Sequence, residues 1–190
     1  MLIIYNNISL LENMYTKINS FREVEISNKK SLIICDIDDT VLKYKKTFSD
    51  FNNNDYYFPG ESDPQKKLEF ALEFYQMYKV IMPTDIEHTD YTGYCEMLTK
   101  LTPESGLIFL TARTSNGHDM TVDQLRQLNI HNPPRDIYYT DNKCLKGEYI
   151  TKYMDLSEWE EIIFIDDSER QILSVACEFP KIRCYLFDFL

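Results

Sequence analysis

Apolar runs of strand length alternate with segments of helical periodicity along most of the chain. Strands are predicted at 31–35, 106–113, 136–140, 161–168 and 181–189. Helices are predicted at 8–22, 65–79, 91–101, 121–130, 146–154 and 169–179. The segment 47–64 is polar and irregular, as is typical of a loop. This alternation predicts an α/β fold with a Rossmann-like, mostly parallel sheet flanked by helices.

The length of 190 residues corresponds to one domain, which we expect to span 1–190. The net charge of −11 disfavours nucleic acid and anionic lipid as partners, although a locally positive pocket could still bind a small anion. No run is long enough to cross a membrane and no secretory signal is evident. Five scattered cysteines without a CxxC pair favour a reducing compartment, so a cytoplasmic location is expected. The oligomeric state stays open.

Polar side chains follow three of the predicted buried strands. Asp36 and Asp38 follow the first strand, Thr111 ends the next, and Asp166 and Asp167 end another. Because ligands of open parallel sheets bind beyond the carboxyl ends of the strands, these groups are expected to converge on one crevice. Four carboxylates placed together need a compensating cation, and a set of oxygen ligands favours Mg²⁺. Such a cation accepts phosphate oxygens, which indicates phosphoryl chemistry.

Phosphate binding in this chain cannot depend on a glycine-rich loop. The sequence has five glycines and contains neither GxxxxGK[ST] nor GxGxxG. A phosphoryl group would therefore be held by metal, backbone amides and side chains at the strand ends. Thr111 and a nearby lysine are the candidates; Lys146 opens a predicted helix, and Lys143 is the alternative.

The string DIDDTVL at 36–42 resembles the first motif of the haloacid-dehalogenase-like superfamily. GLIFLT ending at Thr111, the helix-opening Lys146, and IIFIDD ending in Asp166 and Asp167 resemble the second, third and fourth motifs. Their order and spacing fit, and the resemblance covers roughly 31–190. It implies a haloacid-dehalogenase-like core with a small cap between the first two motifs, at 43–90, that selects substrate and excludes water.

The resemblance also assigns roles to individual residues. Asp36 would attack phosphorus and form an aspartyl-phosphate. Asp38 would protonate the leaving oxygen and then activate water. Thr111 and Lys146 would hold the transferring group and neutralise its charge. The acid at position 38 favours phosphatase or phosphomutase chemistry over dehalogenase chemistry.

By the same resemblance, Mg²⁺ would be bound by Asp36, the main-chain carbonyl of Asp38, and Asp167. Asp166 would assist directly, through water, or by orienting the lysine. Arg113, two residues after Thr111, is a candidate for contact with substrate or with an acid. Tyr56, Tyr57 and Phe58 in the insertion are candidates for a substrate pocket or for packing of the cap.

The expected activity is hydrolysis of a phosphomonoester by a Mg²⁺-dependent phosphatase. A small phosphorylated metabolite or nucleotide is the favoured substrate. The alternatives are a phosphatase acting on nucleic-acid ends or phosphoproteins, a phosphomutase, and a non-catalytic interaction module that retains only the fold. A basic groove beside Asp36 would favour nucleic acid.

Overall fold

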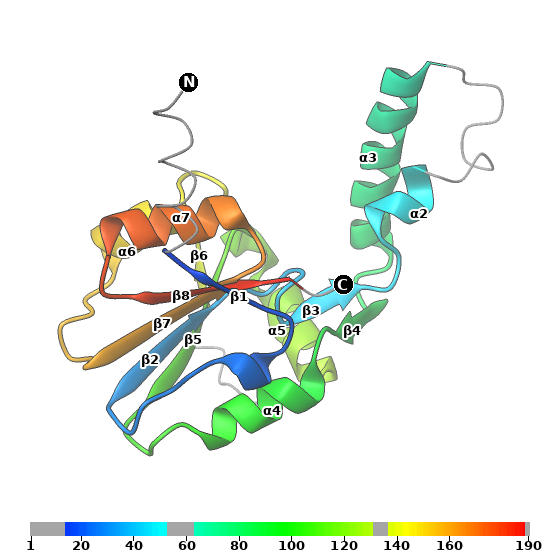
Figure 1. Ribbon diagram of the computed structural model, residues 1–190. Coiled ribbons are helices and arrows are strands. Elements are labelled where there is room, and N and C mark those ends of the chain that lie inside the picture. Colours follow the sequence, from blue (N-terminus) through cyan, green and yellow to red (C-terminus); the bar gives the residue numbers. More distant parts are fainter. Residues whose placement is uncertain (1–13, 53–62, 131–136, 189–190) are drawn as a thin grey trace.

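A six-stranded parallel sheet forms the centre of the molecule (Figure 1). The computed structural model describes residues 14–52, 63–130 and 137–188. The strand order is β1 (Thr16–Ile18), β8 (Arg183–Phe187), β7 (Glu161–Asp166), β2 (Ser31–Cys35), β5 (Gly106–Thr111) and β6 (Ile137–Tyr139). Every strand pair in this sheet is parallel, so all carboxyl ends lie at one edge. The predicted α/β class is confirmed, and the arrangement is consistent with a Rossmann-like fold.

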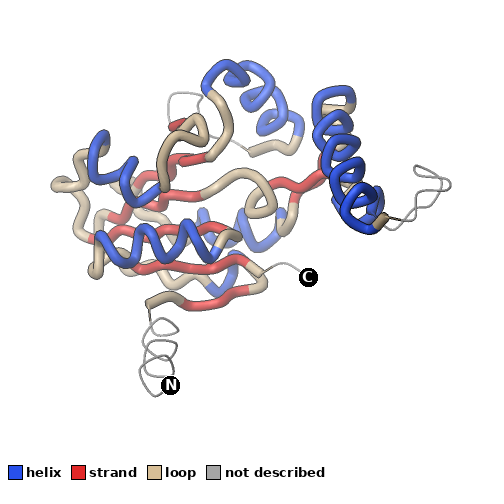
Figure 2. The backbone as a smooth tube through the Cα atoms, turned by 90° about the horizontal axis from the view of Figure 1, so that it is seen from above, coloured by secondary structure: helices blue, strands red, loops and turns tan. Residues whose placement is uncertain are grey.

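Helices cover both faces of the sheet, as the tube in Figure 2 and the ribbon in Figure 1 show. On one face lie α4 (Tyr91–Thr99) and α5 (His118–Gln127), and on the other lie α6 (Lys146–Tyr153) and α7 (Glu169–Glu178). All five residues of β2 are buried, and they alternate between the two cores: Ile33 joins the first, whereas Leu32 and Ile34 join the second. Burial on both sides explains why the strand is continuously apolar.

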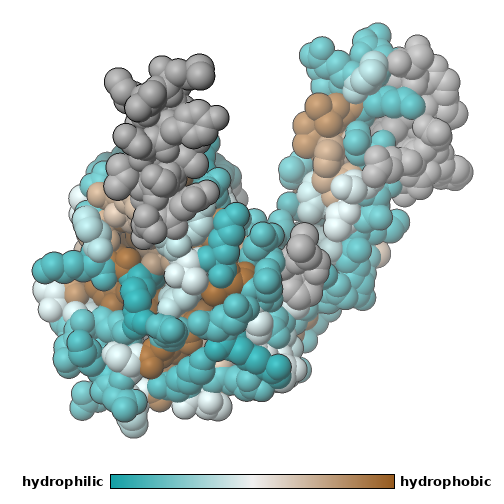
Figure 3. Space-filling model, in the orientation of Figure 1, coloured by the Kyte–Doolittle hydropathy of each residue, from teal (hydrophilic) through white to brown (hydrophobic). Residues whose placement is uncertain are grey.

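An insertion leaves the sheet after the first motif and returns before α4. Its base is an antiparallel pair, β3 (Leu42–Tyr44) with β4 (Ile86–His88). The chain between them forms α2 (Phe48–Asn52) and the long helix α3 (Pro64–Ile81), which project from the rest of the molecule (Figures 1 and 2). Asp63 caps α3 by accepting a hydrogen bond from the Gln65 N–H at 2.9 Å. Much of the apolar surface of α3 is exposed, as the brown atoms on this helix in Figure 3 show.

Most predicted elements are confirmed, with ends that differ by at most three residues, but two predictions are wrong. In place of the described part of the helix at 8–22, the chain forms β1 and a 3₁₀ helix, η1 (Phe21–Glu23). Pairing of β1 with β8, together with a capping box between Ser20 and Glu23, stabilises these elements instead of a helix. The segment 47–64 is not wholly loop, because α2 lies within it. The short strands β3 and β4 were not predicted.

Candidate active site

The predicted site residues meet at the carboxyl edge of the three central strands. Asp36 directly follows β2, Thr111 ends β5 and Asp166 ends β7. Because β2 lies between β7 and β5, these three positions are on adjacent strands. The fold therefore brings together residues that are up to 130 positions apart in the sequence.

Lys146, the first residue of α6, extends into this edge and is fully buried, with 1% of its surface exposed. Its Nζ donates hydrogen bonds to Asp166 Oδ2 at 2.6 Å and to Asp36 Oδ1. Burial would lower the pKa of Lys146, but the charges of Asp36 and Asp166 outweigh it and raise the pKa above its ordinary value. The buried ammonium is thus held in its charged form by two carboxylates.

The position of Lys146 depends on the close contact of α6 with α7. Its backbone N–H donates to Gln171 Oε1 at 2.9 Å, which fixes the first turn of α6. Gly147 follows, and a Cβ at this position would collide with the backbone carbonyl oxygen of Ser174 on α7. Glycine is therefore required here by close approach of the two helices rather than by an unusual backbone angle.

Three carboxylates form a cluster that could hold a cation. Oxygen atoms of Asp36, Asp166 and Asp167 all lie within 4.8 Å of one another. Burial and the neighbouring carboxylates raise the pKa of Asp167 to about 7, and burial also raises the pKa of Asp36 well above its ordinary value. Carboxylates that repel each other in this way are relieved by a hard divalent ion with oxygen ligands, so the residues fit Mg²⁺.

Thr40 supports this cluster and was missed as a site residue by the sequence reasoning. Its buried hydroxyl accepts a hydrogen bond from the Asp167 backbone N–H at 3.0 Å, and Oγ1 lies 3.4 Å from Asp167 Oδ1. It thus connects the loop after β2 to the loop after β7. The signal was present, because Thr40 is the threonine of the DIDDT string.

Asp38 does not belong to the carboxylate cluster. Its side chain forms a two-point ion pair with Arg113, with Nε to Oδ2 at 2.7 Å and Nη2 to Oδ1 at 2.8 Å. Burial would raise the pKa of Asp38, but the hydrogen bonds and charge of Arg113 outweigh it and lower the pKa. Arg113 is fixed in turn by Thr121 at 3.0 Å and Gln124 at 2.7 Å, both on α5. The sequence left substrate or an acid as the partner of Arg113, and the structure shows contact with an acid, Asp38.

The remaining candidates are separated clearly by their burial. Lys143, the alternative lysine, is exposed and pairs with Asp141 at 3.1 Å, whereas Lys146 is the lysine that pairs with Asp36 and Asp166. Thr111 is fully buried, and its hydroxyl accepts a hydrogen bond from the Arg113 backbone N–H at 3.2 Å. The aromatic residues at 56–58 lie outside the described residues.

Comparison with known sequences gives a family but no activity. No curated protein matches the chain significantly. Within residues 14–52, 63–130 and 137–188, no helix is both long enough and apolar enough to cross a membrane. The profile of the family described as "Protein of unknown function (DUF2608)" matches residues 13–144, which include Asp36, Asp38, Thr111 and Arg113. This match spans more than half of the 190 residues of the chain, and the chain therefore belongs to the DUF2608 family.

Proposed function

We propose that the chain is a Mg²⁺-dependent phosphatase with a haloacid-dehalogenase-like core, which hydrolyses a phosphomonoester through an aspartyl-phosphate on Asp36. The observation that carries the proposal is the buried arrangement of Asp36, Lys146 and Asp166, with Asp167 beside it. A carboxylate held next to a buried ammonium and a cation site is suited to attack on an anionic phosphoryl group. A structural role alone would not explain why two buried carboxylates share one buried lysine with a third carboxylate, Asp167, beside them, because a buried excess of negative charge is unfavourable.

Each residue of the site has a separate role in this reaction. Asp36 supplies the attacking oxygen, and the bond from phosphorus to the leaving oxygen breaks as the new bond forms. Lys146 favours the ionised form of Asp36, against the effect of burial, and offsets the negative charge of the phosphoryl oxygens. The Thr111 hydroxyl, at the end of the adjacent strand, contributes a hydrogen bond to that group. Asp36, Asp166 and Asp167 would hold Mg²⁺, which supplies charge neutralisation when it is bound.

Asp38 carries out the proton transfers. The ion pair with Arg113 favours the ionised carboxylate, and this is the form that accepts a proton from the water that cleaves the intermediate. To act as the acid, Asp38 must first carry a proton, which costs it part of its contact with Arg113; it then donates that proton to the leaving oxygen and becomes the carboxylate again. The side chain is one-third exposed, so both water and a leaving group have access to it.

The insertion at 43–90 serves as the cap in this proposal. Helices α2 and α3 project beside the carboxyl edge of the sheet, and Lys79 of α3 lines a cavity together with Asp38. The acidic net charge of −11 favours a small phosphorylated molecule over nucleic acid. We place the enzyme in the cytoplasm, because its five cysteines are unpaired and a reducing compartment suits them.

The test is turnover of an aryl phosphate by the purified protein with and without Mg²⁺. We expect hydrolysis that requires the metal and falls by at least about 10³-fold in Asp36→Asn, because the nucleophile is removed. Asp39→Asn is the matched control: Asp39 is an exposed neighbour with φ of 57°, a conformation that asparagine also adopts. It should retain activity. Equal activity of wild type and Asp36→Asn, or none in either across a broad panel of phosphoesters, would overturn the proposal.

A further inference from the structure

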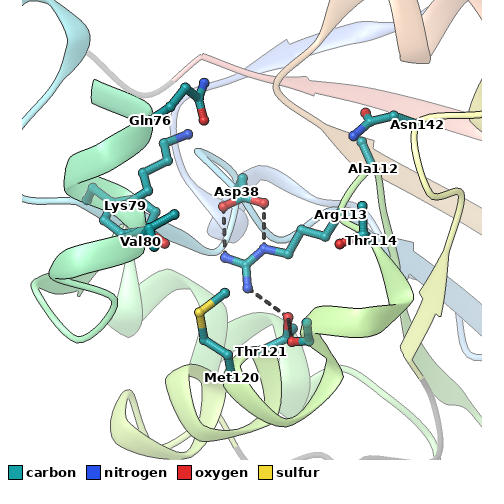
Figure 4. A pocket seen from close by; sticks show the side chains of 12 residues that line it. Asp38, Gln76, Lys79, Val80, Ala112, Arg113, Thr114, Met120, Thr121 and Asn142 are labelled. Atoms are coloured by element: carbon teal, nitrogen blue, oxygen red, sulfur yellow. Dashed lines mark hydrogen bonds and ion pairs between the residues drawn. The ribbon is translucent and has the colours of Figure 1, made fainter. Parts of the chain in front are cut away.

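A cavity of about 560 Å³ opens beside Asp38, between the projecting helix α3 and the first turn of α5 (Figure 4). Its volume lies within the roughly 300–1,000 Å³ that is typical of small-molecule sites. Asp38 forms part of its wall, so the cavity is continuous with the group that handles the proton of the leaving oxygen. No step of the proposed reaction accounts for the rest of this space.

The cavity has more positive than negative charge. Lys79 and Arg113 enter it from opposite walls, whereas Asp38 is the single acid among its lining residues (Figure 4). Two cations and one carboxylate leave one net positive charge. This differs from the molecule as a whole, which carries −11. A local excess of positive charge in an acidic protein attracts a specific anion, because the remaining surface repels it.

Lys79 is the cation that is available to a ligand. Arg113 is already paired with Asp38 and held by α5. Lys79 has no carboxylate partner in the described part of the chain; its Nζ lies over the ring of Tyr75, 4.4 Å from the centroid, and 5.4 Å from that of Tyr44. These contacts position the ammonium without neutralising it.

The other walls of the cavity are largely apolar and would contact carbon atoms of a ligand. Val80 of α3 and Met120 of α5 line the cavity, and Tyr44 adds an aromatic surface. A site with apolar walls and one or two converging charged groups is typical of recognition of a small organic anion.

We propose that this cavity binds the leaving group of the phosphomonoester, and that Lys79 selects a leaving group carrying its own anionic group, a carboxylate or a second phosphate. The inference rests on the proposed function, because it assumes that the phosphoryl group lies at Asp36. It makes Lys79 a specificity-determining residue contributed by the insertion.

The experiment compares binding of two matched esters, 4-carboxyphenyl phosphate and 4-methylphenyl phosphate, which differ by one charge at similar size. Isothermal titration calorimetry in Mg²⁺ on Asp36→Asn protein measures affinity without turnover. We expect the carboxylate to bind about 10-fold more tightly, equivalent to about 1.4 kcal/mol. Lys79→Met should abolish this preference, and Lys79→Arg should retain it. Lys66→Met, an exposed position on the same helix, should leave it unchanged.

Equal affinities of the two esters, or a preference that survives in Lys79→Met, would overturn the inference. Wild-type turnover of 4-methylphenyl phosphate is measured in parallel and tests the proposed function separately. If the wild type turns over the ester but binding shows no preference for the charged one, the proposed phosphatase activity stands and the selective cavity is rejected. If binding shows a preference that depends on Lys79 but the wild type turns over neither ester, the selective cavity stands and the proposed enzyme activity is rejected. Failure of both esters to bind at millimolar concentration rejects the cavity, and if the wild type also turns over neither ester, the proposed function is rejected with it.

Discussion

Removal of the Lys146 charge is expected to cause a large loss of stability. The side chain is buried between Asp36 and Asp166, so Lys146→Met leaves two carboxylates in the interior without their cation. Methionine approximates the length of the lysine stem, and the change therefore tests charge rather than volume. Removing one partner from a buried ionic group generally costs about 3–5 kcal/mol, because the remaining charges are left uncompensated.

The expected change in melting temperature follows from the size of the chain. The entropy of unfolding is about 2.1 cal/mol/K per residue, which gives about 400 cal/mol/K for 190 residues. A loss of about 4 kcal/mol then lowers the melting temperature by about 10 °C. Asp166→Asn should cost less, since the pair of Lys146 with Asp36 persists and the amide oxygen can still accept a hydrogen bond.

The assays are thermal melting, which gives the temperature shift, and urea denaturation, which gives the free energy; both use a chelator, so that no divalent ion replaces the missing charge. Lys152→Met is the matched control, because Lys152 is exposed on the same helix, and its effect should stay within about 0.5 kcal/mol. If Lys146→Met unfolds within about 0.5 kcal/mol of wild type, the lysine is not buried between two ionised carboxylates in solution, and the reasoning fails.

Three further predictions concern the cation site, one histidine and one glycine. With a dissociation constant near 1 mM, 10 mM Mg²⁺ should stabilise the fold by about 1.4 kcal/mol, or about 2–4 °C, and less in Asp167→Asn; equal shifts in thermal melts would count against the cluster. Burial lowers the pKa of His88 to about 4, so this residue is neutral in the folded state while the unfolded chain binds a proton below about pH 6.5. The free energy of unfolding should therefore decrease between pH 6.5 and 4, by about 1–2 kcal/mol after allowance for partial exposure. His88→Asn, whose amide can still accept the Asp90 N–H, should flatten this dependence in denaturation at several pH values, and an unchanged slope would contradict the assignment. Gly147→Ala should cost about 1–3 kcal/mol because its methyl group meets the Ser174 carbonyl, and an unaltered melting curve would show that α6 and α7 are less closely packed.

The sequence predicted the central sheet because its signals are local. The run SLIIC is apolar at every position, and only a strand buried on both faces needs this pattern. The polar residues after such strands, Asp36 and Asp166, were placed at one edge by the geometry of parallel sheets alone. The helix-opening position of Lys146 likewise favoured it over Lys143, and the structure buries the first and exposes the second.

The parts that the sequence did not predict depend on pairing between distant segments. A run as short as Thr16–Ile18 has little strand signal of its own, and it forms a strand because β8 offers a free edge. The partners of Arg113 were also beyond local patterns, because Asp38 lies 75 positions away and Gln124 lies on a separate element, α5. Hydrophobic periodicity predicts individual helices and strands, whereas contacts between separate segments are known only once the topology of the sheet is known.

The base of the insertion has a consequence for how this family can change. Tyr44 pairs with Ile86, and the Lys45 N–H donates to the Asp85 carbonyl at 3.1 Å, so the chain leaves and re-enters the core at a single point. The residues between are, in topological terms, the loop of a hairpin. They can be lengthened, shortened or exchanged without altering the order of the central strands. The surface that the insertion presents beside Asp38 can thereby change among relatives while the residues around Asp36 stay the same.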